Sequence, residues 1–342
     1  MANIMVNEAC NLRCPYCFAE EFVNKDPKEM AFDDFKKALA FAMSDEDERQ
    51  VGIIGGEPLL YSHINDAMRY AINHPRTEYV MIYTNAVDLE RLAPDILEDP
   101  KFRMLVNCNS PDDMGEAAFE KMRRNLLDFA YNHNGTRRFR LSVNLYKPDF
   151  DYSYVIPLMQ EIDFDVVRLS VSVPQKGDLI GKTPLEYFRE MKLVAMRFVC
   201  DMIRLSVITG FDCNFLPACV LSEEEIESVL PAKDVFYGAL KDMYSDMFWD
   251  RAIVCEIHNC SPVIDILPDL KAIRCFGLSE HTKQDIHEFR NLTDLAEYYI
   301  HTVDRPACAL AASPECRDCS SSINGDCSGG CLLFKAGGLF KS

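Results

Sequence analysis

The stretch Cys10-Asn11-Leu12-Arg13-Cys14-Pro15-Tyr16-Cys17 places three cysteines within eight residues, directly after the apolar run Ile4-Met5-Val6. Thiolates spaced this closely on one loop can hold a single metal centre. Three cysteine ligands, rather than four, would leave one iron of a [4Fe–4S] cube open to another ligand. A disulfide with one spare thiol and a zinc knuckle are the alternatives for this stretch.

The composition points to an intracellular metalloprotein. The chain has 342 residues, which suffices for one large domain and a small one, and its 15 cysteines gather mainly in residues 10–17 and 255–331. We expect no signal peptide and no membrane-spanning helix, and therefore a cytoplasmic protein whose cysteines bind metal rather than form disulfides. The net charge of −18 argues against nucleic-acid binding and is compatible with a small-molecule or a basic peptide substrate.

Apolar strands alternate with helical patterns along the first half of the chain. Strands are predicted at residues 2–7, 51–54, 79–83, 103–106, 138–145 and 166–171. Helices are predicted at residues 31–43, 62–73, 88–98, 115–132, 152–162 and 185–207. Such a repeat implies a parallel sheet with helices on its outside. Six strands fall short of the eight in a closed barrel, so the sequence predicts an α/β fold with a partial (β/α)6 TIM-type barrel.

The character of the chain changes near residue 250, where cysteines become dense and regular periodicity fades. We therefore predict a barrel at residues 1–180, a helical connector at residues 181–250 and a cysteine-rich domain at residues 251–342. Polar residues or glycines end each predicted strand, and in α/β barrels the reactive site is built at that end.

Two motifs resemble one family. The CxxxCxxC pattern with Tyr16 before its last cysteine resembles the cluster loop of radical S-adenosylmethionine (SAM) enzymes, and Gly55-Gly56-Glu57-Pro58 stands where that family carries a GGEP segment. The resemblance implies that Cys10, Cys14 and Cys17 hold a [4Fe–4S] cluster whose open iron binds the amino and carboxylate groups of SAM. One electron then cleaves the adjacent C–S bond, and the 5′-deoxyadenosyl radical abstracts a substrate hydrogen.

The same resemblance assigns further residues to SAM. Peptide carbonyls at Gly55 and Gly56, with the carboxylate of Glu57, can accept hydrogen bonds from the SAM ammonium group, and Tyr16 can lie against the adenine. By analogy, Asn107, Asn109 or Ser110 and Asn144 would reach the ribose or the methionine carboxylate, and ordinary turn polarity is the alternative for them. The family often has Ser-Asp-Gly after its fourth strand, where this chain has Asn107-Cys108-Asn109-Ser110, which bears on the ribose contact. No acid or base is assigned. The remaining members of the predicted cofactor-binding set are Pro58, Asn107, Asn109, Ser110 and Asn144.

The tail resembles the SPASM extension of some radical SAM enzymes, which holds two auxiliary Fe–S clusters. The resemblance implies one [4Fe–4S] cluster on Cys255, Cys260, Cys275 and Cys331, and another on Cys316, Cys319 and Cys327 with Cys308 in place of a missing terminal cysteine. The spacing x7 between Cys319 and Cys327 departs from the usual x5. Cys219 competes with Cys255 as a ligand, and a zinc ribbon on the last four cysteines is the alternative. With the SAM-binding cluster, three [4Fe–4S] clusters are predicted.

These resemblances predict an enzyme that modifies a peptide or protein by forming a crosslink or thioether, with an electron donor such as flavodoxin or ferredoxin. Because the first predicted strand begins at residue 2, we expect no leader-binding domain before it. Phe276-Gly277 follows Cys275, where sulfatase-maturing enzymes have an aspartate, which counts against that activity. A radical SAM alcohol dehydrogenase acting on small molecules and a noncatalytic Fe–S or zinc protein are the other interpretations.

Overall fold

The computed structural model describes residues 2–163, 166–173, 181–211, 216–222, 224–225, 263–323, 329 and 331–340. The chain forms two compact units. The first comprises Met1–Leu141, Gln160–Asp163 and Pro262–Val303, and the second comprises Ser142–Met159, Phe164–Ser261 and Asp304–Ser342. The predicted boundary near residue 250 lies outside the described residues, so the three-domain division stays a prediction.

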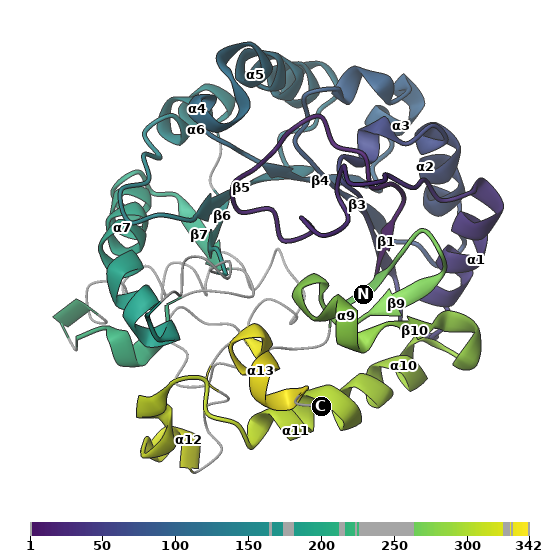
Figure 1. Cartoon of the computed structure of the whole chain (residues 1–342). Helices are drawn as coiled ribbons and strands as arrows, with labels where there is room; N and C mark the ends of the chain where they lie inside the picture. Colours follow the sequence, from purple (N-terminus) through teal and green to yellow (C-terminus); the bar gives the residue numbers. More distant parts are fainter. Residues whose placement is uncertain are drawn as a thin grey trace. The chain divides into compact units, whose positions relative to one another are not determined.

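The first unit contains parallel strands covered by helices, as predicted. Its strands β1 (Ala2–Met5), β2 (Gln50–Ile54), β3 (Tyr79–Thr84) and β4 (Phe102–Asn107) are parallel neighbours in that order. All four residues of β1 are buried, as expected for a parallel strand covered on both faces. The helices α1 (Phe32–Ala42), α2 (Ile64–Ile72), α3 (Pro94–Glu98) and α5 (Glu116–Asn132) lie outside these strands (Figure 1). The predicted α/β class is confirmed.

One predicted helix is wrong in its extent. Residues 88–98 form a 3₁₀ turn at Leu89–Arg91 and a separate short helix, α3, rather than one continuous helix. Pro94 explains the break, because it has no N–H for a helical hydrogen bond and is tolerated only in a first helical turn.

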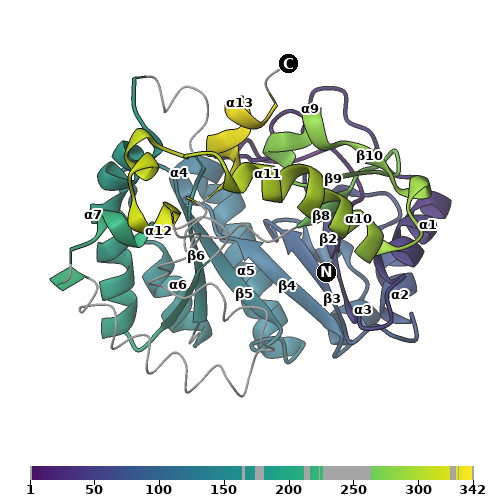
Figure 2. The same ribbon diagram turned by 90° about the horizontal axis from the view of Figure 1, so that it is seen from below.

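The other edge of this sheet comes from far along the chain. Strand β8 (Ile264–Ile266) pairs in parallel with β1, and β9 (Lys271–Ile273) and β10 (Gln284–Asp285) follow it in antiparallel pairs (Figure 2). Asn3 of β1 donates a hydrogen bond of 2.8 Å to the buried Asp265 of β8. A side chain at position 52 would collide with Asn3, which explains the glycine there. The sequence did not predict this strand group, because the runs are only two or three residues long.

The second unit contains the later part of β5 (Phe139–Leu145), together with β6 (Val166–Val171) and β7 (Ile208–Phe211). β7 pairs in parallel with β6 and is a further strand that was not predicted. The long helix α7 (Pro184–Arg204) was predicted, and Thr183 with Glu186 forms a capping box at its start. The remaining described helices are α4 (Pro111–Met114), α6 (Val155–Ile162), α9 (Ser279–Thr282), α10 (Leu292–Tyr299), α11 (Arg305–Cys308), α12 (Ser320–Ile323) and α13 (Ala336–Leu339). Within the described ranges, no helix is long and apolar enough to cross a membrane.

Candidate metal centre

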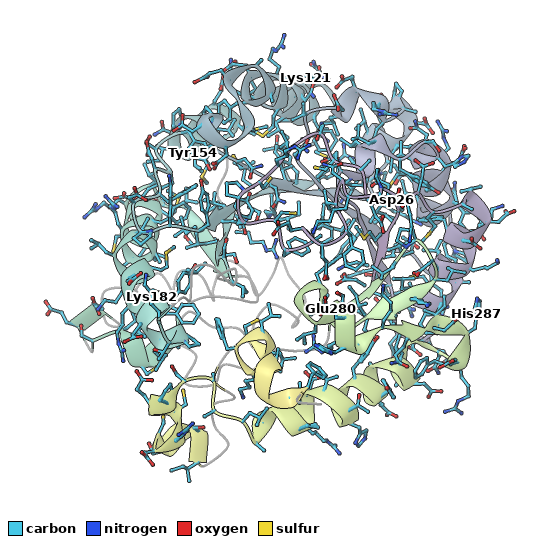
Figure 3. All side chains as sticks on the ribbon, in the orientation of Figure 1. Asp26, Lys121, Tyr154, Lys182, Glu280 and His287 are labelled. Atoms are coloured by element: carbon cyan, nitrogen blue, oxygen red, sulfur yellow. The ribbon has the colours of Figure 1, made fainter. Side chains whose placement is uncertain are left out.

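The three N-terminal cysteines lie on the loop between β1 and α1, within the first unit. Cys10, Cys14 and Cys17 are free thiols and each is partly buried. The N–H of Cys17 donates to the carbonyl oxygen of Cys14 at 3.1 Å, which turns the chain between these two thiols. The loop then runs past Asp26, labelled in Figure 3, toward α1. The loop therefore presents three thiols from one short stretch, as the sequence predicted.

The surroundings of these thiols oppose their ionisation in the absence of a metal. Burial raises the pKa of Cys10 to about 12 and that of Cys14 to about 11, and it also raises the pKa of Cys17. Charge on the other two thiols and on Glu57 adds to the shift of Cys10, so the three sulfurs are close enough to interact. Thiolate ligands at this site need a cationic centre to offset their burial, and binding of the metal would release protons.

Two N–H donors act in the opposite direction and favour thiolates. The N–H of Leu12 donates to Cys10 Sγ at 3.4 Å, and Asn109 Nδ2 donates to Cys14 Sγ at 3.0 Å. Among the described residues, no three Cys, His, Asp or Glu side chains converge to hold a single metal ion. A [4Fe–4S] cube with one open iron takes three thiolates, each on a separate iron. A single zinc ion in a structural site takes four ligands.

Asn24 anchors the start of the loop and was not predicted as a site residue. Its Oδ1 accepts from the N–H of Cys10 at 2.9 Å, and its Nδ2 donates to the Cys10 carbonyl oxygen at 3.0 Å. Its φ of 59° lies in the left-handed region, which asparagine tolerates better than most residues. Nothing in the sequence marks this asparagine apart from that preference.

The glycines of the GGEP segment lie against the strand that leads into the cluster loop. A Cβ on Gly55 would stand 2.2 Å from Asn7 Oδ1, and one on Gly56 would stand 2.4 Å from the carbonyl oxygen of Ala9. The N–H groups of Gly56 and Glu57 donate to the carbonyl oxygens of Asn7 and Ala9 at 2.9 and 2.7 Å. Close packing on the segment before Cys10 is therefore one reason for glycine at these two positions.

Glu57 is an internal anchor, with 1% of its surface exposed. Its carboxylate accepts from Thr84 Oγ1 at 2.6 Å and from the N–H groups of Asn85 and Leu59 at 2.8 and 3.1 Å. Burial raises its pKa to about 7, although these three donors pull it back. The carboxylate thus ties the end of β3 to the GGEP segment, and Pro58 begins the buried 3₁₀ turn that follows. Asn85, which the sequence did not assign to the site, extends the link by donating from Nδ2 to Asn11 Oδ1 at 2.7 Å.

The residues after β4 divide into two groups. The hydroxyl of Tyr16 donates to Asn109 Oδ1, and Asn109 in turn donates to Cys14, so these two predicted residues do meet the cluster loop. Ser110 Oγ accepts from the N–H of Asp113 at 3.1 Å and caps α4, which gives it a structural task. Asn107 is half-buried at the end of β4, and Asn144 lies on the part of β5 that belongs to the second unit.

The described tail cysteines are distributed between the two units. Cys275 lies in the first unit, whereas Cys308, Cys316, Cys319 and Cys331 lie in the second. Cys308 and Cys316 line one cavity of about 630 Å³, together with Arg317, Phe334 and Lys335. Two of the four predicted ligands of the distal cluster therefore share a cavity. Cys255, Cys260 and Cys327 lie outside the described residues, and Cys219 is exposed after β7.

Comparison with known proteins defines the class. Residues 4–132 match the model of the Radical SAM superfamily. GTP 3′,8-cyclase of Chlorobaculum tepidum is 34% identical over 95 residues, which are 28% of this chain and 28% of that protein. GTP 3′,8-cyclase of Sulfurimonas denitrificans is 29% identical over 129 residues, covering 36% of this chain and 40% of that protein. The chain thus spans only about a third of the length of the curated relatives it matches.

Solved structures are similar over nearly the whole chain. Streptococcus suis SuiB bound to precursor peptide SuiA has a TM-score of 0.63 at 16% identity, covering 97% of this chain and 71% of SuiB. Native anSMEcpe with bound AdoMet has a TM-score of 0.63 at 14% identity, covering 96% of this chain and 88% of that protein. The fold is that of an α/β protein that carries three cysteines on the loop after its first strand. Residues 4–132 are a radical SAM domain.

Proposed function

We propose that this protein reductively cleaves SAM at a [4Fe–4S] cluster held by Cys10, Cys14 and Cys17. The observation that carries the proposal is the packing of the GGEP segment on Asn7 and Ala9, directly before a loop that carries three partly buried thiols. When bound, the cluster would supply the electron that breaks a C–S bond of SAM and so yields a radical able to take hydrogen from a substrate.

In this reaction the residues of the chain would stabilise the cluster thiolates and hold the loop in position. The N–H groups that reach Cys10 and Cys14 would stabilise the thiolates and help to set the reduction potential, since hydrogen bonds to sulfur do so. Asn24 and Glu57 would keep the loop and the adjacent strand ends in fixed positions. Because the Glu57 carboxylate already accepts three protein hydrogen bonds, the peptide carbonyls of the GGEP segment are the better candidates to accept from an ammonium group.

We further propose a peptide or protein substrate, with two auxiliary clusters in the tail. Support comes from the extent of the fold likeness, which covers 97% of this chain in SuiB with its precursor peptide. An acidic protein with a net charge of −18 would favour a basic substrate. The shared cavity beside Cys308 and Cys316 supports a metal centre there.

A nucleotide substrate is the second candidate, because the curated relatives are GTP 3′,8-cyclases. Their matches are no longer than the radical SAM segment of 129 residues, so they leave most of the chain uncompared. GTP can be tested directly as a substrate. We expect GTP to leave the rate of SAM cleavage unchanged; consumption of GTP coupled to faster cleavage would replace the peptide proposal.

The primary test is formation of 5′-deoxyadenosine from SAM by the anaerobically reconstituted, dithionite-reduced protein. The wild-type protein should form it, Cys14→Ala should not, and Cys200→Ser, which changes a cysteine of α7 in the second unit, should behave as wild type. About 12 Fe per chain is expected for three clusters, by ligand counting. Wild-type protein that holds about 4 Fe or more and forms no 5′-deoxyadenosine would overturn the proposed activity.

A further inference from the structure

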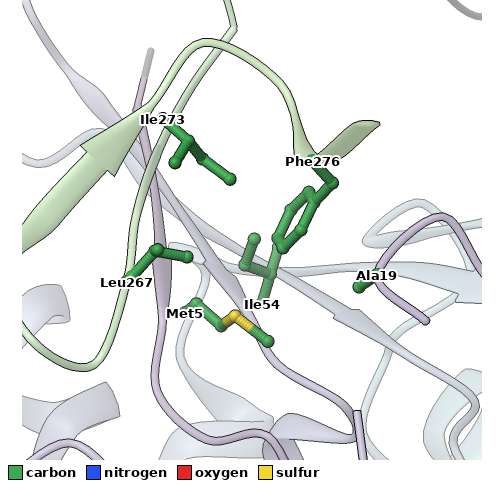
Figure 4. Packing of buried hydrophobic residues seen from close by; sticks show 6 residues of the cluster. All are labelled: Met5, Ala19, Ile54, Leu267, Ile273 and Phe276. Atoms are coloured by element: carbon green, nitrogen blue, oxygen red, sulfur yellow. The ribbon is translucent and has the colours of Figure 1, made fainter. Parts of the chain in front are cut away.

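An aromatic side chain from the tail packs directly on the cluster loop. Phe276 begins the 3₁₀ turn Phe276–Leu278 and is 3% exposed. It belongs to a buried cluster with Met5, Ile54, Leu267, Ile273 and Ala19, the last of which comes from the loop itself (Figure 4). Cys17 packs against the edge of this cluster. The surroundings of one cluster cysteine are therefore completed by a residue more than 250 positions further along the chain.

Two loop aromatics enclose Phe276. The Phe18 ring meets it edge to face, with centroids 5.0 Å apart and planes at 72°, and the Phe22 ring does so at 5.8 Å and 80°. Phe18 itself is 66% exposed, so its ring stands between Phe276 and solvent. Edge-to-face pairs of this kind add attraction beyond the area that they bury.

Polar contacts reinforce the same junction. Lys283 Nζ lies over the Phe22 ring at 5.3 Å from its centroid. The hydroxyl of Ser279, on α9, donates to Glu21 Oε1 of the loop. The loop residues between these contacts form a tight turn, in which the N–H groups of Phe22 and Val23 donate to the Ala19 carbonyl oxygen at 2.9 and 3.0 Å. The turn after Cys17 is thus fixed from the tail by apolar, cation–π and hydrogen-bond contacts.

This packing has a consequence for a cluster bound at Cys17. A [4Fe–4S] cube with three thiolate ligands carries a charge of about −1 when oxidised and about −2 when reduced. Water stabilises the more highly charged form more strongly, so excluding water keeps the reduction potential low. Burial also limits access of oxygen to the iron.

We propose that Phe276 is a positioning residue that shields the Cys17 corner of the SAM-binding cluster and thereby lowers its reduction potential. The inference rests on the proposed function. Because Phe276 directly follows Cys275, the same contact joins a candidate auxiliary ligand to the SAM cluster loop. The tail then contributes to the radical SAM centre by packing, and this contribution does not depend on any auxiliary cluster in the tail.

The test compares Phe276→Ala and Phe276→Leu with a matched control, Phe289→Ala. Phe289 lies in the same tail segment, but its ring partner is Tyr298, at 5.5 Å, rather than the loop. The midpoint potential is measured by EPR-monitored redox titration, following the signal that changes when SAM is added, which separates this cluster from others. The rate of cluster bleaching in air gives a second readout that needs no turnover.

Phe276→Ala should raise the midpoint potential and bleach several-fold faster, Phe276→Leu should lie between it and wild type, and Phe289→Ala should match wild type. If Phe276→Ala does not fold, Phe18→Ala removes the exposed ring of the junction and should shift both readouts in the same direction by less. Unchanged potential and bleaching in the folded variants would overturn the shielding role alone. Wild-type protein with no SAM-sensitive EPR signal would overturn the proposed function as well.

Discussion

The N-terminal and tail cysteines differ in what holds them. Cys10 receives a hydrogen bond from the backbone of Leu12, and Cys14 receives one from Asn109, which follows β4 of the first unit's sheet. Among the described tail cysteines of the second unit, Cys316, Cys319 and Cys331 lie in or beside helical segments of four residues. Cys308 differs, because α11 directly follows the π-helical turn Ile300–Asp304. Helical segments this short have little stability of their own. If loop and tail bind clusters as proposed, the sheet prepares the first site before metal binds, whereas the tail sites would depend on metal for their stability.

The segment 263–303 stands between these two cases. It comes from the tail in sequence but belongs to the first unit, where β8 pairs with β1 and Phe276 packs on the loop. Part of the cysteine-rich tail therefore forms strands of the first unit's sheet.

Among these variants, the largest effect on SAM cleavage is expected from breaking the close packing under the N-terminal loop. In Gly56→Ala the new Cβ would stand 2.4 Å from the carbonyl oxygen of Ala9, so the segment before Cys10 must move. Such overpacking costs about 1–3 kcal/mol. If this cost falls on cluster binding, about 1.4 kcal/mol corresponds to tenfold weaker binding, so we expect lower iron content and a matching loss of 5′-deoxyadenosine formation.

Gly337→Ala is the control, because a Cβ at Gly337 has no heavy atom within 4 Å. It should retain wild-type iron and activity. Equal behaviour of the two variants would show that the GGEP glycines are not needed for packing on the cluster loop.

The second prediction separates the two kinds of site. Cys319→Ala should remove about 4 of roughly 12 Fe per chain while sparing SAM cleavage in the absence of substrate. Iron analysis and 5′-deoxyadenosine measurement on the same preparation check it. Loss of cleavage in protein that keeps its first cluster would contradict the division of labour between loop and tail.

Cys308→Ala sharpens the same prediction. Cys308 shares a cavity with Cys316, so the two variants should lose the same iron if Cys308 is the fourth ligand. Full iron content in Cys308→Ala would remove it from the ligand set.

The sequence predicted the structure correctly where a regular pattern of apolar residues coincides with a known motif. Strands β1 to β6 could be predicted from apolar runs, and the three loop thiols from the spacing of the cysteines. The position of the loop also followed, because parallel strands bring their carboxyl ends to one edge of the sheet. The sequence failed for β8 to β10, whose two or three residues carry no period, and for Asn24, whose importance depends on a left-handed backbone and a partner 14 residues away. It did not indicate that the side chain of Ser110 caps a helix. Contacts of this kind depend on tertiary structure that local patterns do not encode.

A third prediction tests whether segment 263–303 contributes to the stability of the first unit through the buried Asp265 of β8. Burial raises the pKa of Asp265 to about 6 from 3.8, although the Asn3 amide and the Arg274 charge pull it back. The folded state therefore disfavours the charged form. Relative to Asp265→Asn, wild-type stability should fall by roughly 3 kcal/mol as the pH rises from about 4 to about 6, and stay level above that.

Denaturant unfolding of both proteins across this pH range checks the prediction. Tyr299 also interacts with Asp265 electrostatically, but it stays neutral in this range because burial raises its pKa. A difference between the two proteins that does not change with pH would mean that Asp265 is solvated, and that β8 does not bury it against β1.

The smallest effect is expected at Asn24, where two variants separate the contribution of the side-chain hydrogen bonds from that of the left-handed backbone. Asn24→Gly loses both side-chain hydrogen bonds to Cys10 but keeps access to the left-handed backbone at φ 59°. Asn24→Ala loses the bonds and adds backbone strain as well. We expect destabilisation of about 1 kcal/mol for glycine and about 2 kcal/mol for alanine, measured by denaturant unfolding of the metal-free protein. If the sheet holds the loop in place, both variants should destabilise the protein before iron is added. Destabilisation seen only in the iron-loaded protein would mean that the cluster, rather than the sheet, orders the loop as well as the tail.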